Sequence, residues 1–152
     1  MLALVIVMTM LPVLAIAAGM ALFMRRRNNT ATLYEDGGLS VPLSAAFGSL
    51  RGVGPFAGTH NNFNPLLVLH GDRVEYRVVR RTTVPYAELA GVDISPAHRT
   101  PSLILTFTGT GFVFTGKVTG RQALTDALRF LQGKDCPLSA AAREFLATPA
   151  AV

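Results

Sequence analysis

The residues that most often carry chemistry are sparse in this chain. His60, His70 and His98 stand at no i, i+3 or i+4 spacing, and Cys136 is remote from all three in the sequence. Metal sites usually draw on closely spaced ligands of these types, so the sequence predicts no metal site and three histidines in exposed turns. Cys136 precedes a proline and is the only cysteine, which favours a half-buried structural thiol over a nucleophile or a disulfide.

Motifs for phosphate binding and for acid–base chemistry are missing as well. Gly109-Thr110-Gly111 lacks the lysine of a phosphate-binding loop and separates two apolar runs that are typical of strands. The G-x-S-x-G pattern of a serine nucleophile does not occur. Glu75, Glu88 and Asp93 are more simply interpreted as surface residues of strands than as a catalytic pair. We therefore expect a protein that is not an enzyme and that needs no cofactor.

Arginines are the remaining chemical signal in a chain of net charge +5. If residues 73–80 form a strand, Arg73 and Arg77 share one face, and Arg81 joins them unless a bulge intervenes. Together with Arg99 they form a candidate interaction face that could contact anionic lipid headgroups or an acidic patch on a protein. An ordinary solvated sheet face is an equally simple interpretation. Nucleic acid is not expected as a partner, because the charge is modest and the aromatic residues are better interpreted as core.

An apolar stretch opens the chain and is followed at once by charge. All of the first 24 residues except Thr9, Pro12 and Gly19 are apolar, and three arginines follow, namely Arg25, Arg26 and Arg27. A helix over residues 2–24 would be about 34 Å long, which is enough to cross the hydrocarbon core of a bilayer. A cleaved signal peptide is the alternative, but a signal peptide carries its positive charge before the apolar run. We predict an uncleaved transmembrane helix over residues 1–24.

The same charges predict the orientation of the chain. The positive-inside rule keeps Arg25, Arg26 and Arg27 on the cytoplasmic side, at the membrane interface. The expected location is the inner, or cytoplasmic, membrane, with a single pass, the N-terminus outside and the C-terminal domain in the cytoplasm. Small residues in the stretch, Ala15, Ala18 and Gly19, form a patch suited to packing against other transmembrane helices.

The remaining residues predict the elements that would position these groups. Residues 28–64 are rich in glycine, serine, asparagine and proline and predict either a tether or the irregular start of the fold, with a turn or two of helix over residues 43–50. Strands are predicted over residues 66–69, 73–80, 82–84, 89–94, 103–107 and 112–114, the last two as a hairpin. An amphipathic helix over 123–131, ended by Gly133, and a short helix over 139–147 complete the chain. Five residues should meet in the core, namely Leu105, Phe107, Phe114, Leu124 and Leu128.

Three segments carry a resemblance to a known family. Residues 66–77 (LLVLHGDRVEYR), 84–92 (VPYAELAGV) and the hairpin 103–107 with 111–114 resemble the corresponding parts of bacterial PH-like (pleckstrin-homology or GRAM-like) domains. The resemblance implies a mainly-β (α+β) domain, an antiparallel sheet or partly open barrel closed by a C-terminal helix. The expected division is a transmembrane helix at 1–24, a basic juxtamembrane segment and tether at 25–63, the PH-like domain at 64–133 and a short helix and tail at 134–152.

Location and resemblance together predict a non-enzymatic function. We expect a membrane-tethered PH-like interaction module that binds a protein partner or anionic lipid headgroups on the cytoplasmic side. The alternative is an accessory or structural subunit of a larger integral membrane complex, with its helix packed on other transmembrane helices. The expected partners are thus the lipid bilayer, one or more membrane proteins and anionic lipids.

Overall fold

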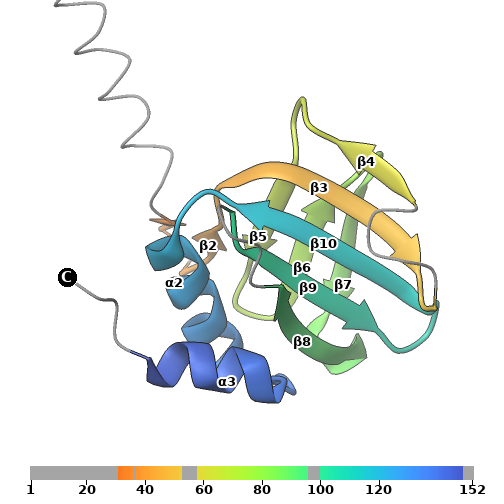
Figure 1. Cartoon of the computed structure of the whole chain (residues 1–152). Helices are drawn as coiled ribbons and strands as arrows, with labels where there is room; N and C mark the ends of the chain where they lie inside the picture. Colours follow the sequence, from red (N-terminus) through yellow and green to blue (C-terminus); the bar gives the residue numbers. More distant parts are fainter. Residues whose placement is uncertain (1–30, 36, 53–57, 96–99, 149–152) are drawn as a thin grey trace, which may run out of the picture.

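The described part of the chain folds into two antiparallel sheets and two helices (Figure 1). The structure is a computed structural model that describes residues 31–35, 37–52, 58–95 and 100–148. Sheet A contains, in spatial order, β1 (Thr32–Leu33), β2 (Leu39–Ser40), β5 (Leu66–Leu69), β6 (Arg73–Arg77) and β7 (Arg81–Pro85). Sheet B contains β4 (Thr59–Asn61), β3 (Leu43–Leu50), β10 (Phe112–Val118), β9 (Ser102–Phe107) and β8 (Leu89–Ser95).

The chain passes from one sheet to the other at three places, one of which is the loop of residues 62–65 between β4 and β5. Only Val41 and Pro42 separate β2 from β3, and the amide of Val41 donates to the carbonyl of Leu67 at 2.9 Å before the chain enters sheet B. The last passage is the single 3-10 turn η1 (Tyr86–Glu88) between β7 and β8. These short connections hold the two sheets face to face around a common core.

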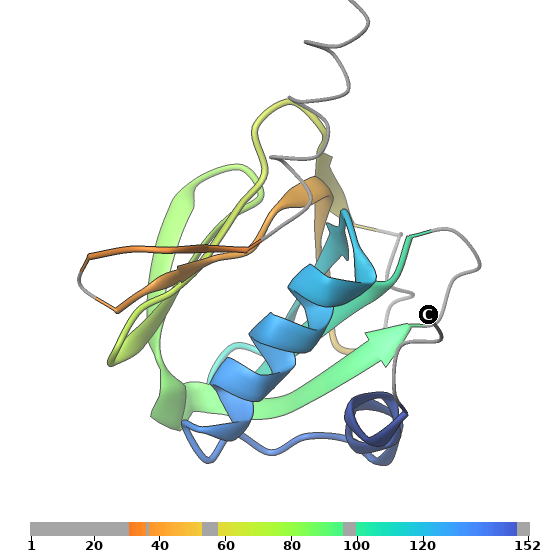
Figure 2. The same ribbon diagram turned by 90° about the vertical axis from the view of Figure 1, so that its left-hand side faces the viewer.

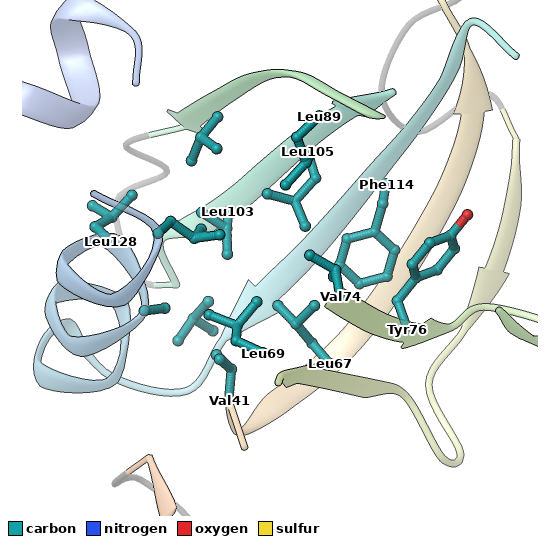
Figure 3. Packing of buried hydrophobic residues seen from close by; sticks show 14 of the residues in the cluster. Val41, Leu67, Leu69, Val74, Tyr76, Leu89, Leu103, Leu105, Phe114 and Leu128 are labelled. Atoms are coloured by element: carbon teal, nitrogen blue, oxygen red, sulfur yellow. The ribbon is translucent and has the colours of Figure 1, made fainter. Parts of the chain in front are cut away.

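Helix α2 (Arg121–Gln132) covers one end of the space between the sheets, as Figure 2 shows. Its apolar residues recur at the spacing of one helix face, and all of them are buried, namely Ala123, Leu124, Ala127, Leu128 and Leu131. In Figure 3, Leu128 approaches the core from the helix, while Leu67 and Leu69 approach it from β5. The five residues predicted to meet in the core belong to one buried cluster.

Aromatic rings fill the part of the core that lies away from α2 (Figure 3). The ring centroid of Tyr76 lies 5.1 Å from that of Phe114, and the two rings lie side by side in Figure 3. The ring centroid of Phe107 lies 5.2 Å from that of Tyr76. Phe112 stacks on the same tyrosine at 5.8 Å. Gly48 of β3 passes directly beneath Phe112, because a Cβ atom at this position would meet that ring at 2.6 Å. The strand therefore needs glycine where it crosses the aromatic cluster.

Helix α3 (Ala140–Ala147) packs beside β8 and α2. Ser139 caps it, since its hydroxyl accepts from the amide of Ala142 at 3.1 Å and donates to Asp93 at 2.5 Å. The residues just before the helix pair with the edge of β8: Val92 donates to the carbonyl of Pro137 and accepts from the amide of Ser139, both at 2.8 Å. The C-terminal segment thus covers part of the outer edge of sheet B.

The predicted fold class is wrong. The prediction was a transmembrane helix followed by one antiparallel sheet, or a partly open barrel, closed by a C-terminal helix, whereas the described residues form two five-stranded sheets and carry two helices. The physical reason is that residues 32–61 supply two strands to each sheet. Among the residues that the structure describes, no helix is long and apolar enough to cross a membrane. The predicted span at 1–24 lies outside them.

One local prediction also fails, while the later elements are confirmed. Residues 43–50 form the strand β3 and not a helical turn, because they pair with β10 on one side and β4 on the other. The strands predicted between residues 66 and 114, the hairpin of β9 and β10 and both C-terminal helices are present.

Candidate functional site

The outer face of β5, β6 and β7 carries three of the four residues predicted to form an interaction face. Along β6, Val74 and Tyr76 are buried, so Arg73, Glu75 and Arg77 project from the opposite side. The antiparallel register sets Arg77 directly opposite Arg81 of β7. Like charges in this position repel each other, and the surrounding groups must compensate for them.

Glu75 supplies the compensation. One of its carboxylate oxygens accepts from Nε of Arg81 and the other lies against Nε2 of His70, both at 2.9 Å. The side chains of Glu75 and His70 are each 16% exposed, while that of Arg81 is 64% exposed. The carboxylate therefore sits under the arginine and interrupts the basic face that the sequence predicted to be continuous.

The other two arginines have different surroundings. Arg73 contacts the neighbouring Asp72 at 2.9 Å at the far end of β6. Arg77 donates from Nε to the backbone carbonyl of Asn64 at 3.0 Å, and no carboxylate among the described residues pairs with it. The charge of Arg73 is thus balanced by the carboxylate of Asp72, whereas no carboxylate of the described residues balances the charge of Arg77.

Positive charge concentrates where β6 turns into β7. Arg80 lies in this turn and is exposed. The strand alternation in the sequence does not place Arg80 on the face of Arg73 and Arg77. We call Arg77, Arg80 and Arg81 the basic corner. In Figures 1 and 2 the β6–β7 turn lies at the same end of sheet A as the loop between β4 and β5.

A shallow cavity of about 270 Å³ opens beside the corner. It is lined by Tyr34, Leu66, Val68, His70, Glu75 and Arg81. Tyr34 was missed by sequence reasoning, because it lies in the turn between β1 and β2 and nothing in the sequence places that turn beside β5 and β6. The cavity combines an apolar floor with a guanidinium and an imidazole, but Glu75 already binds both. The carboxylate of Glu75 therefore balances the cationic side of the cavity.

Residues with other chemical potential lie elsewhere. Cys136 is buried, and burial raises the pKa of its thiol above the usual value, with the charge of Asp135 adding to the rise. The thiol is therefore protonated at neutral pH and is a poor nucleophile. Within the described ranges, no three histidine, cysteine or acidic side chains are close enough to hold a metal ion.

Several predicted residues lie outside the described part of the chain. These are the interface arginines Arg25, Arg26 and Arg27, the helix-packing residues Ala15, Ala18 and Gly19, and Arg99 of the interaction face. The structure therefore brings Arg77 and Arg81 together, sets Arg73 apart and leaves the others as predictions from the sequence.

Two comparisons with known proteins bear on the family of this chain. No protein-family model matches the chain, and no curated protein matches it. The resemblance to bacterial PH-like domains stays a prediction from the quoted segments.

Proposed function

We propose that this protein is a non-catalytic interaction module held at a membrane, and that its basic corner binds the anionic headgroups of phospholipids. The observation that carries the proposal is the pairing of Arg77 with Arg81 across β6 and β7, next to the exposed Arg80. Only one carboxylate, that of Glu75, is paired with this group of three cations among the described residues. The corner therefore retains a net positive charge.

Two further features support a membrane as the binding surface. The first 24 residues are almost wholly apolar and end in three arginines, a composition that favours attachment to a bilayer with an anionic cytoplasmic leaflet. The sequence between residues 59 and 71 also contains no acidic residue, so the loop beside the corner would not repel phosphate groups. Each arginine near such a surface contributes about 1 kcal/mol.

The test uses the full chain in lipid nanodiscs with and without about 30% of an anionic phospholipid. We expect hydrogen exchange of the amides in residues 59–85 to slow in the anionic discs only, and to speed up again at high salt, which screens exposed charges. The triple variant R77Q/R80Q/R81Q should lose this protection. A matched variant, R51Q/R129Q/R143Q, removes the same charge from exposed positions elsewhere and should keep it.

Two results would contradict the proposal. One is equal protection in neutral and anionic discs, and the other is protection that survives in the triple variant. Either would show that the corner is an ordinary solvated surface.

A further inference from the structure

The loop between β4 and β5 is held by hydrogen bonds and exposes one aromatic side chain, that of Phe63. Oδ1 of Asn61 accepts from the amides of Phe63 and Asn64 at 2.9 and 3.1 Å. The carbonyl of Asn64 accepts from Nε of Arg77 at 3.0 Å, which ties the loop to the basic corner. Pro65 follows and restricts the backbone further. In this fixed turn Phe63 is 100% exposed.

A second apolar side chain lies at the same end of sheet A. Val79, in the turn between β6 and β7, is 69% exposed. The register that pairs Leu66 with Arg77 places this turn and the Phe63 loop next to each other along the strand ends, and both views show them at one end of the sheet (Figures 1 and 2). Exposed apolar side chains are ordinary when scattered singly. Here two of them flank a cluster of arginines.

The position of the Phe63 end of sheet A relative to the start of the chain indicates which partner this end would contact. Phe63 and Thr32 line the same groove, of about 510 Å³. Thr32 is five residues after Arg27, so the covalent chain limits the distance between them to about 18 Å. If residues 1–24 attach the chain to a bilayer, the Phe63 loop lies within reach of the headgroup layer. An apolar tip flanked by cations, in a loop whose sequence contains no acidic residue, matches the interface of an anionic membrane.

We propose that the Phe63 loop, with Val79 beside it, inserts into the interfacial layer of the bilayer to which the chain is attached. This inference rests on the proposed function, since it requires the membrane. It adds a specific second contact: the basic corner binds headgroups, and Phe63 enters the layer beneath them. Two contacts on one rigid end would fix the orientation of the domain on the membrane, whereas a single attachment point would leave it free to rotate.

The chain contains no tryptophan, which allows a direct test with a single fluorescent residue. Phe63→Trp replaces one fully exposed ring with another, so the fold should be unchanged. The matched control is Leu50→Trp, because Leu50 is 60% exposed and lies at the opposite end of β3 from Leu43, which lines the groove with Phe63. Each full-length variant is reconstituted into vesicles of phosphatidylcholine and an anionic phospholipid, with and without bromine on the acyl chains.

We expect emission from the tryptophan at position 63 to shift to shorter wavelength, and brominated lipid to quench it about twofold more strongly than at position 50. Equal quenching at the two positions, or none at either, would overturn the inference. A blue shift without bromine quenching would also overturn it, since the ring would then be covered by protein, such as a second copy of the chain.

The outcomes separate this inference from the proposed function. If brominated lipid does not quench the tryptophan at position 63 but residues 59–85 are still protected in anionic discs, only the insertion of Phe63 is contradicted. If both the quenching and the protection are absent, the proposed membrane-binding role of this end of the domain is contradicted as well.

Discussion

Glu75 determines how much of the arginine charge is available. Its carboxylate binds Arg81 and His70 from a position that is mostly shielded from solvent. Glu75→Gln keeps the shape and removes the charge, so Arg81 should become free to bind anions. We expect stronger protection of residues 59–85 on anionic discs and a loss of about 1 kcal/mol in unfolding free energy. Glu88→Gln, an exposed acid on η1, is the control and should change neither quantity.

Tyr86 makes the stability of the fold depend on alkaline pH. Its hydroxyl donates to the carbonyl of His70 at 2.6 Å. Burial raises the pKa of Tyr86 well above its usual 10.0, and the nearby Cys136 and Asp72 raise it further. The unfolded chain therefore releases this proton near pH 10 while the folded chain retains it. The stabilisation is complete below that pH and is lost as the pH rises above it.

Tyr86→Phe cannot ionise in either state. Its unfolding free energy should therefore fall less steeply than that of the wild type between about pH 9 and about pH 11. At neutral pH it should be lower by about 1 kcal/mol, because the hydrogen bond is lost. Urea titration of the full chain in detergent micelles at a series of pH values measures both effects. Tyr34→Phe, at an exposed tyrosine, is the control; parallel pH profiles for Tyr86→Phe and the wild type would refute the argument.

At the scale of elements, α2 contributes to the stability of the fold through the buried side chains of one helix face. Leu128 is fully buried at the centre of its apolar face. Leu128→Ala should lower the unfolding free energy by about 2–5 kcal/mol, through lost burial and the cavity that remains. Gln132→Ala, at an exposed position at the end of the same helix, should cost no more than about 0.5 kcal/mol. An unchanged urea midpoint for Leu128→Ala would mean that α2 does not close the core.

The elements predicted correctly are those whose pattern is local. The alternation along β6 gave both its buried and its exposed face, and the spacing of Leu124, Leu128 and their neighbours gave α2. β3 was misinterpreted because Leu43, Phe47 and Leu50 have helical spacing. Its buried positions are instead the small residues between them, which depend on contacts with β4, β10 and Phe112. No short window of sequence contains those contacts.

The same distinction applies to the candidate site. The period of a strand was enough to place Arg73 and Arg77 on one face, and the register of the hairpin added Arg81. The pairing of Glu75 with Arg81 and the approach of Tyr34 from the turn after β1 arise only when the strands assemble. The turn held by Asn61 was also missed, although an asparagine whose side chain accepts from the amides two and three residues later is a recognised turn signal.

For the molecule as a whole, the proposed function requires the described domain and the apolar stretch to contact the same membrane. The proposal places the described domain on the cytoplasmic side of the inner membrane, since Arg25, Arg26 and Arg27 would be costly to move across it. In this orientation the basic corner faces the leaflet that carries the anionic lipids. The opposite orientation would place the corner on a surface where its charge has less to bind.

Trypsin can report this orientation, because it cleaves after arginine and the three arginines connect the apolar stretch to the domain. At high salt, which screens the contacts of the basic corner with headgroups, we expect trypsin added to inverted inner-membrane vesicles to release the domain into the supernatant. Trypsin added to intact spheroplasts should leave it attached. The variant R25Q/R26Q/R27Q should give a mixed orientation, because the charge asymmetry that sets it is removed; the vesicle assay then needs a protease site introduced at Asn28. Release of the wild-type domain from intact spheroplasts would place it outside the cytoplasm. The corner would then face a leaflet different from the one that the headgroup proposal requires.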